Sequence, residues 1–144
     1  TDYDLVKLQI GIAAGEELKI KQEDISVRGH AIQCRINAEH PQTFVPSPGK
    51  ITQWGKPGGI GVRVDSHVYD GCIISPYYDA LIAKICTHGI DREEALARMS
   101  FALEEFFVEG IDTNKDLQEI ILNEENFKNA NLSINYLQNV LDID

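Results

Sequence analysis

The sequence predicts an α+β domain in which an antiparallel sheet is flanked by helices. Segments with the period-two alternation of strands lie between residues 28 and 87, and segments with the apolar spacing of helices follow from about residue 91. Runs of strands followed by runs of helices are typical of α+β folds rather than of alternating βαβ units. The 144 residues, 43% of them hydrophobic, suit one domain that buries about two-thirds of its unfolded surface.

Composition and charge exclude several classes of partner. The net charge of −10 argues against a nucleic acid or an anionic membrane, because phosphate contacts need clustered Lys and Arg. No apolar run approaches the length of a membrane span and no basic-then-apolar leader opens the sequence, so we expect a cytoplasmic protein. Three widely spaced cysteines without a C-x-x-C pair fit reduced thiols in that compartment. They are Cys34, Cys72 and Cys86.

The first segment, residues 1–14, is predicted to form a helix. Thr1 and Asp4 fit a variant of the capping box, in which each side chain meets the orphan amide near the other. Gly15 supplies a C-terminal stop. Three apolar residues share one stripe: Leu5, Leu8 and Ile12. A helix at residue 1 with no initiator Met before it suggests a piece of a longer chain.

Residues 28–41, RGHAIQCRINAEHP, predict a strand whose two faces differ. One face carries His30, Ile32, Cys34 and Ile36, and the other carries Ala31, Gln33, Arg35 and Asn37. The second face has two interpretations: a solvated surface, which composition alone favours, or the wall of a cleft. In a cleft, Arg35 would offer planar donors and a permanent charge to an anion or a developing oxyanion.

Two β-rich runs, KITQW at residues 50–54 and IGVRV at residues 60–64, predict a hairpin. The residues GKPGG between them form its five-residue loop. Although it is rich in glycine, this loop matches neither the P-loop nor the dinucleotide-binding pattern and does not open a helix, so it predicts no phosphate site. In the second strand, Ile60, Val62 and Val64 share one face, while Arg63 and Asp65 share the other.

The last strand and the remaining helices occupy the rest of the sequence. An apolar run at residues 81–87 predicts the strand. Three helices follow, at residues 91–110, 113–122 and 134–141. Asp91 and Glu94 make a D-x-x-E cap for the first of them, and Thr113 caps the second. The first helix carries an apolar stripe of Ala95, Met99, Ala102 and Phe106.

The sequence contains no recognisable nucleophile or metal motif. No serine lies in a G-x-S-x-G context, and no cysteine lies in a reactive neighbourhood. The four histidines lack metal-ligand spacing, so no metal site is predicted. His30, on the apolar face of its strand, is interpreted as a hydrogen-bonded core histidine. From the residues alone we predict a soluble α+β domain with one candidate arginine, Arg35.

The segment around Arg35 resembles a family signature. RGHAIQCRINAEHP is similar to the C-terminal domain of biotin carboxylase, where the segment usually is R-G-H-A-I-E-C-R-I-N-A-E-D-P. The resemblance continues in the family's order and covers nearly the whole chain. Its further segments are FVPSPGKIT, PGGIGVRVDSHVYDG, PYYDALIAK, REEALARMSFALEEF and GIDTNKDL.

The resemblance implies the C-terminal part of an ATP-grasp biotin carboxylase, with residues 1–144 as its C-terminal domain. Such enzymes use Mg-ATP to activate bicarbonate as carboxyphosphate and transfer the carboxyl group to N1 of biotin on a carrier protein. They serve acetyl-CoA carboxylase, in fatty acid biosynthesis, and propionyl-CoA and pyruvate carboxylases. The implied partners are the remainder of the biotin carboxylase chain, a biotin carboxyl carrier protein, a carboxyltransferase and a second copy in a homodimer.

Arg35 takes the catalytic role in this resemblance. In the family, the arginine of C-R-I-N-A-E lies beside the ureido oxygen of biotin and the bicarbonate, so Arg35 is the implied catalytic and biotin/bicarbonate-binding residue. A fixed guanidinium would stabilise the oxyanion that deprotonation of biotin N1 produces. Gln33 replaces a Glu that the family usually has, which removes a charge close to Arg35 on the same face.

Other positions carry further implications. Asn135 stands where bacterial members often have a His near the nucleotide, and an amide can still donate and accept hydrogen bonds. The homodimer contacts of the family fall on Ile60 and Arg63, with Asp79 expected nearby. Ile60 replaces a residue that is often Phe, and a smaller anchor buries less area at an interface.

Several parts of the family's site have no counterpart in this sequence. Its glycine-rich lid, nucleotide-binding lysines, metal-binding glutamates and bicarbonate-positioning arginine lie upstream. The 144 residues are therefore predicted to bind no cofactor and to be inactive alone, whereas the parent enzyme uses ATP, Mg and biotin. The alternative interpretation is a structural and dimerisation module of a propionyl-CoA or pyruvate carboxylase. The sequence does not determine which carboxylase the parent serves.

Overall fold

The computed structural model describes residues 1–141 and is built around a three-stranded antiparallel sheet. β1 (His30–Asn37) and β4 (Val62–Ser66) lie on either side of β6 (Leu81–Gly89). The predicted strands in residues 28–41 and 81–87 are confirmed. Burial along β1 alternates as the period-two pattern predicts, with Ile32, Cys34 and Ile36 buried and Ala31, Gln33 and Arg35 exposed.

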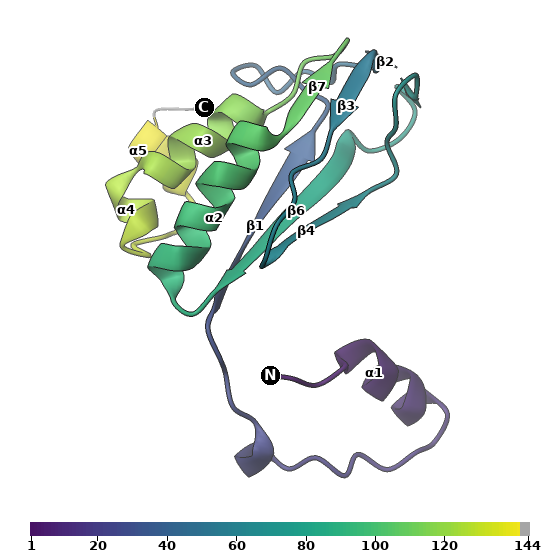
Figure 1. The fold of residues 1–144 in the computed structure, drawn as a ribbon, viewed down its shortest axis with the longest axis vertical. Coiled ribbons are helices and arrows are strands. Elements are labelled where there is room, and N and C mark those ends of the chain that lie inside the picture. The colour runs from purple at the N-terminus through teal and green to yellow at the C-terminus, as the bar shows by residue number, and fades with distance from the viewer. Residues whose placement is uncertain (142–144) are drawn as a thin grey trace.

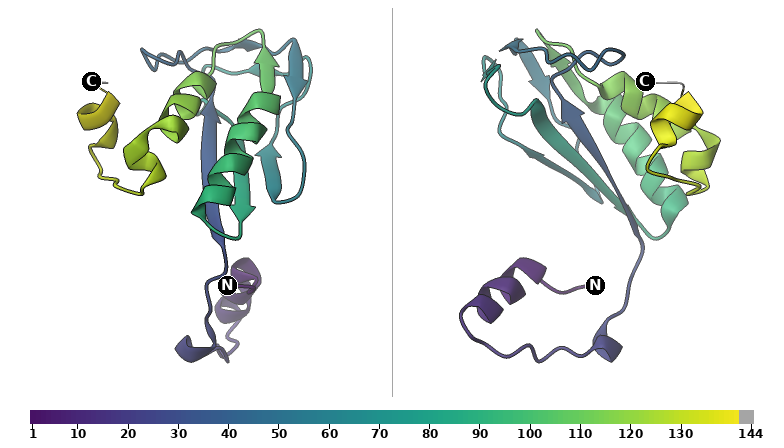
Figure 2. Two further views of the ribbon diagram at one scale, coloured as in Figure 1. Left: turned by 60° about the vertical axis from the view of Figure 1, so that its left-hand side comes forward. Right: turned by 180° about the vertical axis from the view of Figure 1, so that it is seen from behind.

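Helices cover one face of this sheet and continue past its β1 edge (Figure 1, Figure 2). α2 (Arg92–Glu105) packs on the sheet, and three shorter helices follow it. They are α3 (Lys115–Asn123), α4 (Glu125–Lys128) and α5 (Tyr136–Leu141). Asp91 begins α2 by accepting a hydrogen bond from the Glu94 amide at 2.9 Å, as the D-x-x-E pattern predicts. The α+β class, with an antiparallel sheet and flanking helices, is confirmed.

The core lies between α2 and the covered face of the sheet. The predicted stripe is at most 1% exposed: Ala95, Met99, Ala102 and Phe106. It belongs to one apolar cluster with Ile36 of β1 and Ile85 of β6. Burying one large aliphatic side chain contributes about 1.5–3 kcal/mol, so this layer holds the helices on the sheet.

α2 ends at Glu105 rather than at the predicted residue 110, because the chain turns there into a strand. That strand, β7 (Phe107–Glu109), pairs with β3 (Gln53–Gly55). Trp54 of β3 meets the ring of Phe106 edge to face, with ring centroids 5.1 Å apart. Packing against Trp54 and pairing with β3 therefore end the helix early.

The predicted hairpin between KITQW and IGVRV is wrong. β3 pairs with β7 and β4 pairs with β6, so the two runs belong to different sheets. A further small sheet joins β2 (Gly49–Lys50) to β5 (Ile73–Ile74). At Gly55, a Cβ would lie 2.0 Å from the Phe107 ring, so glycine is needed for β7 to approach. Local turn signals do not reveal a partner strand so far along the chain.

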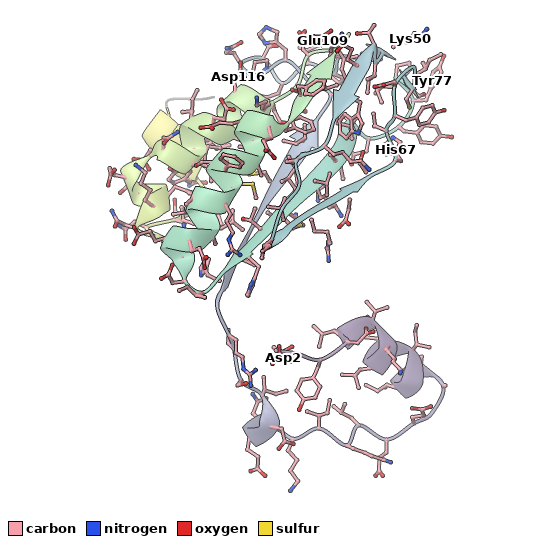
Figure 3. The ribbon with its side chains drawn as sticks, in the orientation of Figure 1. Asp2, Lys50, His67, Tyr77, Glu109 and Asp116 are labelled. Carbon is pink, nitrogen blue, oxygen red and sulfur yellow. The ribbon has the colours of Figure 1, made fainter. Side chains whose placement is uncertain are left out.

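Residues 1–29 form an arm that lies apart from the sheet and its helices (Figure 1, Figure 2). The arm contains α1 (Leu5–Ala13) and a short 3-10 helix, η1 (Gln22–Asp24). Figure 3 shows the Asp2 side chain with the arm, away from the labelled residues of the sheet and helices. No α1 side chain is buried, and the predicted stripe of Leu5, Leu8 and Ile12 is exposed or half-buried. The stripe does not join the core.

The capping of α1 differs from the prediction. Asp4 is the N-cap residue and accepts a hydrogen bond from the Lys7 amide at 3.0 Å. The predicted Thr1–Asp4 capping box is therefore wrong, since Asp4 caps with its own side chain. Gly15 follows the helix at φ 89°, in the left-handed region that favours glycine, and confirms the predicted stop.

The start of α3 also differs from the prediction. The N-cap residue is Asn114 rather than Thr113, and the Asn114 side chain makes no hydrogen bond to the first turn. None of the predicted helices corresponds to α4. Glu124 caps it by accepting a hydrogen bond from the Phe127 amide at 3.0 Å. α5 corresponds to the predicted last helix as far as residue 141.

Candidate functional site

Arg35 lies near the end of β1, on the face of the sheet opposite to α2. Its neighbours Cys34 and Ile36 are buried in the core, so the alternation of a strand turns Arg35 away from the helices. We call this second side of the sheet the open face. It comprises the exposed or half-buried residues Ala31, Gln33, Arg35, Arg63, Asp65, Lys84, Cys86 and His88. The open face thus consists of residues from three strands, and the candidate arginine is one of them.

Two positive charges lie side by side on the open face. Arg35 is directly opposite Lys84 across β1 and β6, and Lys84 is directly opposite Asp65 across β6 and β4. Like charges in directly opposite positions repel each other. Within residues 1–141, neither the Arg35 guanidinium nor the Lys84 ammonium forms an ion pair. The pair offers N–H donors of two cations to an anion.

Sequence reasoning did not single out Lys84, although its place on the strand at residues 81–87 follows from the period-two pattern. What makes it a neighbour of Arg35 is the register between β1 and β6. A local pattern predicts which face a residue takes but not which residue lies across from it.

Gln33 neighbours Arg35 on the open face but bonds elsewhere. Its side-chain oxygen lies 3.6 Å from the Cys86 Sγ, which donates to it. The side-chain oxygen of Gln33 thus accepts a hydrogen bond from a thiol.

A cavity of about 510 Å³ lies beside Gln33, Arg63 and Cys86 on the open face, and Arg35 is not among its lining residues.

The backbone of Arg35 is held by Asn114, which the sequence patterns do not mark as part of a site. Asn114 is only 4% exposed and lies directly before α3. Its Nδ2 donates to the Arg35 carbonyl at 3.2 Å, and its Oδ1 accepts from the Asn37 amide at 2.9 Å. An Asn directly before a helix is typical of an N-cap. Its contact with β1 is a product of tertiary structure.

The three predicted dimer residues do not form one patch within a single copy of the chain. Ile60 is 89% exposed in the turn before β4, and Arg63 lies opposite Cys86 near the end of β6. Asp79 precedes the start of β6, about 20 Å from Cys86 by the rise of an extended strand. Figure 3 shows Tyr77, close to Asp79 in sequence, at the end of the sheet where β4 finishes. Within one chain, Asp79 therefore does not lie near Arg63, and the dimer contacts of these residues stay a prediction.

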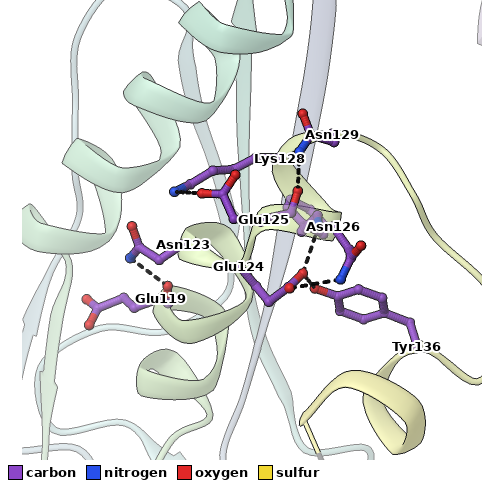
Figure 4. Close-up of polar contacts among 9 residues, drawn as sticks. Glu119, Asn123, Glu124, Glu125, Asn126, Lys128, Asn129 and Tyr136 are labelled. Atoms are coloured by element: carbon purple, nitrogen blue, oxygen red, sulfur yellow. Dashed lines mark hydrogen bonds and ion pairs between the residues drawn. The ribbon is translucent and has the colours of Figure 1, made fainter.

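Asn135, the predicted nucleotide-proximal residue, is exposed and lies directly before α5. The next residue, Tyr136, is buried and donates a hydrogen bond to the Glu124 carboxylate at 2.6 Å (Figure 4). Glu124 also accepts hydrogen bonds from the Asn126 side chain and the Phe127 amide, both at 3.0 Å. These contacts join α5 to α4 and determine where Asn135 lies on the helical layer.

The contact between Tyr136 and Glu124 shifts two pKa values in opposite directions. Burial raises the pKa of Tyr136 to about 12, and the hydrogen bond to Glu124 and its negative charge add to the rise. The hydrogen bond from Tyr136, together with bonds from Phe127 and Asn126, lowers the pKa of Glu124. Both shifts favour a protonated phenol that donates to an ionised carboxylate at neutral pH.

One known protein family matches the part of the chain that contains most of the open face. The family described as the biotin carboxylase C-terminal domain matches residues 33–139. The chain belongs to this family. The matched residues include Arg35 and Asn114, and the resemblance seen in RGHAIQCRINAEHP is confirmed.

Relatives extend the match of the biotin carboxylase domain to the whole chain. The biotin carboxylase of Pseudomonas aeruginosa is 51% identical over 144 residues, which are 100% of this chain and 32% of that protein. The biotin carboxylase of Haemophilus influenzae is 54% identical over 141 residues, which are 98% of this chain and 32% of that protein. The chain thus spans about a third of the length of the curated relatives that it matches.

Solved structures confirm the biotin carboxylase fold. One is the biotin carboxylase domain dimer of the Hydrogenobacter thermophilus 2-oxoglutarate carboxylase, in complex with MgADP, ADP and bicarbonate. The TM-score is 0.90 at 43% sequence identity, and the match covers 96% of this chain and 31% of that chain. The complete pyruvate carboxylase of Rhizobium etli has a TM-score of 0.93 at 35% identity, over 99% of this chain and 14% of that chain. The fold is that of the C-terminal part of an ATP-grasp biotin carboxylase, as expected.

Two side chains on the covered face of the biotin carboxylase domain have structural roles. The Nε2 of His30 lies 3.0 Å from Nη1 of Arg92, which confirms the predicted hydrogen bond, although His30 is half-buried rather than a core residue. Burial raises the pKa of Cys34 to about 12, with a smaller contribution from Cys86. The Cys34 thiol is therefore protonated at neutral pH and is not a nucleophile.

The described part of the biotin carboxylase domain offers neither a metal-binding cluster nor a membrane span. Among residues 1–141, no three side chains of His, Cys, Asp or Glu gather so that they could hold a metal ion. No helix within the same residues combines the length and the apolar character needed to cross a membrane.

Proposed function

We propose that this domain is part of an ATP-dependent biotin carboxylase, a ligase that carboxylates biotin on a carrier protein with bicarbonate. In this proposal residues 1–144 supply Arg35 to the biotin and bicarbonate site of the enzyme. The open face supports it, because Arg35 is exposed beside Lys84 and forms no ion pair with the described residues. Such a guanidinium is available to an anion from outside the domain.

The chemistry of biotin carboxylation suits a guanidinium. Removal of the N1 proton of biotin leaves negative charge on the ureido oxygen, and bicarbonate is itself an anion. The planar donors of Arg35 can meet such an oxygen through a charge-assisted hydrogen bond. Losing one donor of this kind typically costs about 3–4 kcal/mol of transition-state stabilisation, or roughly two to three decades in rate. Lys84 adds a second positive charge near the same anion.

The described residues offer no cluster of protein ligands for a metal ion. Among residues 1–141, no three side chains of His, Cys, Asp or Glu gather so that they could hold one. We therefore assign the nucleotide and Mg to the rest of the biotin carboxylase chain, with Asn135 approaching the nucleotide from the α5 side. Because groups of this kind act as a unit, the domain is expected to bind no cofactor and to be inactive alone.

The proposed enzyme acts with other proteins. Its partners would be the remainder of the biotin carboxylase chain, a biotin carboxyl carrier protein, a carboxyltransferase and a second copy of itself, in the cytoplasm. The relative from Hydrogenobacter thermophilus is described as a dimer, which supports the homodimer. The relative from Rhizobium etli is a pyruvate carboxylase, which supports pyruvate carboxylation as one reaction that the parent serves. Acetyl-CoA carboxylation, in fatty acid biosynthesis, and propionyl-CoA carboxylation stay alternatives.

A second candidate function is that of a structural and dimerisation module. Ile60 supports it, because this apolar side chain is 89% exposed in the turn that leads to Arg63. Light scattering of the full-length protein tests this candidate. A dimer that becomes a monomer in Arg63→Glu would support it, and a wild-type monomer would exclude it.

Release of ADP by the full-length protein that contains this domain tests the main proposal. With Mg-ATP, bicarbonate and free biotin, Arg35→Ala should lower the biotin-dependent rate roughly 100- to 1,000-fold. The matched control is Arg28→Ala, which removes an arginine of the arm that pairs with Asp2 at 3.0 Å. A wild-type rate in Arg35→Ala would contradict the role of Arg35. Activity of residues 1–144 alone would contradict the assignment of the nucleotide to the rest of the chain.

A further inference from the structure

Asn114 binds the backbone of β1 at the point from which Arg35 projects. Its Nδ2 donates to the Arg35 carbonyl at 3.2 Å, and its Oδ1 accepts from the Asn37 amide at 2.9 Å. Its own backbone amide donates to the Asn37 carbonyl at 3.2 Å. One residue thus engages three backbone groups around Arg35.

These backbone groups lie along the free edge of the sheet. β1 is an edge strand, because the strand order is β1-β6-β4. An edge strand presents N–H and C=O groups that have no ladder partner. The primary amide of Asn offers one acceptor and two donors, and can therefore pair with a strand edge as a peptide group does. Beside Arg35, Asn114 thus forms the kind of hydrogen bonds with the β1 edge that a neighbouring strand would form.

A nearby carboxylate fixes the orientation of the Asn114 amide. Glu39 Oε1 lies 3.1 Å from the Asn37 Nδ2 and 3.5 Å from the Asn114 Nδ2. The NH₂ group of Asn114 therefore faces two oxygens, those of the Arg35 carbonyl and the Glu39 carboxylate, while its oxygen faces an N–H. A carboxylate at position 114 would turn a second oxygen toward these acceptors. The site is specific for an amide.

The Asn114 side chain bonds to β1 instead of capping its own helix, α3. Asn114 is the N-cap residue of α3, and Asn is among the favoured N-cap residues. Its side chain nevertheless makes no hydrogen bond to the first turn of α3 and is buried against β1. A buried polar side chain that bonds a strand instead of its own helix indicates a role at that strand.

We propose that Asn114 is a positioning residue for Arg35, which aims the guanidinium by fixing the backbone that carries it. The inference rests on the proposed function, in which Arg35 contacts biotin and bicarbonate. The side chain of Arg35 is long and exposed, so its reach depends on a fixed Cα. A displacement of about 1 Å in a reacting group can cost a hundredfold in rate.

A double-mutant cycle in the full-length protein tests this role. Asn114→Ala, Arg35→Ala and the double variant are compared by biotin-dependent ADP release at saturating Mg-ATP. We expect Asn114→Ala to lower kcat about 10- to 100-fold in the wild-type background and by less than about twofold in the Arg35→Ala background. A residue that acts through the guanidinium has nothing to position once the guanidinium is gone.

The matched control is Asn123→Ala, at the opposite end of α3 from Asn114. It removes a side-chain hydrogen bond to the Glu119 carbonyl at 2.9 Å, which lies within the helix itself, and should leave the rate unchanged. If Asn114→Ala fails to fold, Asn114→Asp takes its place in the cycle. The Asp is nearly isosteric and keeps an acceptor for the Asn37 amide, but loses the donor to Arg35.

Three outcomes separate this inference from the proposed function. An equal fold-loss in both backgrounds would overturn the positioning role, because general damage to the fold is not relieved by removing Arg35. A slow Arg35→Ala beside a normal Asn114→Ala would overturn the positioning role alone. A normal rate in Arg35→Ala would overturn the proposed function of Arg35 and, with it, the reason for positioning it.

Discussion

The two faces of the β1-β6-β4 sheet consist of alternating residues of the same strands, yet they have opposite surroundings. The covered face holds Ile36 and Ile85, both 0% exposed under α2. The open face holds Arg35 and Lys84, the residues that directly precede them in the sequence. One short strand can therefore contribute to the core and to a candidate site at once. Substitutions at adjacent positions should separate stability from activity.

The largest effect is expected on the covered face. Ile36→Ala removes fully buried atoms and leaves a cavity, so the free energy of unfolding should fall by about 2–5 kcal/mol. Urea denaturation followed by circular dichroism measures this loss. Arg35→Ala is the control, and its free energy of unfolding should stay within about 0.5 kcal/mol of wild type. Equal losses in the two variants would mean that the faces are not separable.

A substitution of Arg35 on the open face should lower the rate of the reaction and leave the stability of the fold unchanged. Arg35→Lys keeps the positive charge but loses the planar donors, so biotin-dependent ADP release by the full-length protein should fall about 10- to 100-fold, or roughly 1.4–2.8 kcal/mol. The melting temperature of the variant should match that of wild type. A lysine variant with full activity would show that charge alone is sufficient.

A change of pH tests the helical layer beyond the β1 edge. The pKa of Tyr136 is raised from 10.0 to about 12, so the folded state keeps its phenol protonated at pH values where the unfolded state ionises. This contribution to stability is complete below pH 10 and is lost as the pH rises through about 12.

Tyr136→Phe should therefore flatten the alkaline part of the stability curve. The variant lacks the hydrogen bond to Glu124, so it should be less stable than wild type at neutral pH. The difference should shrink between pH 10 and about 12, where wild type loses the contribution. Urea denaturation at several pH values measures both curves, and curves that stay parallel over this range would refute the shift.

The smallest effect is expected at Lys84. Repulsion from Arg35 and attraction to Asp65 act on the same ammonium from opposite sides, and each is worth about 0.2–1 kcal/mol. Lys84→Met should therefore change the free energy of unfolding by less than about 0.5 kcal/mol. In the full-length protein, the same variant should raise the KM for bicarbonate, because one of two cations near the anion is lost. A KM equal to that of wild type would remove Lys84 from the site.

Local patterns predicted what depends on local geometry. The alternation of residues in β1 predicted which side chains lie on each face of the strand, with Arg35 on the exposed face, because successive side chains of a strand point to opposite sides. The helical stripe with Met99 and Phe106 was predicted in the same way and is buried. The family resemblance then implied a chemical role for Arg35, which the residues alone had left open.

Long-range pairing was beyond the reach of these patterns. β3 pairs with β7 rather than with the strand that follows it, because Trp54 packs on Phe106 and Gly55 admits the ring of Phe107. Asn114 resembles an N-cap in the sequence, and its bonds to β1 exist only once α3 lies beside that strand. Contacts of this kind depend on packing between elements that no local period encodes.

The two faces also differ in the chemistry of their thiols. Cys34 lies on the covered face, 3% exposed, with its pKa raised to about 12, whereas Cys86 is half-buried on the open face. Because the thiolate is the reacting species, an alkylating reagent at neutral pH should modify Cys34 only when β1 leaves the core. The rate of that modification measures the opening of the strand that carries Arg35. The candidate site therefore has a natural chemical reporter in the adjacent residue.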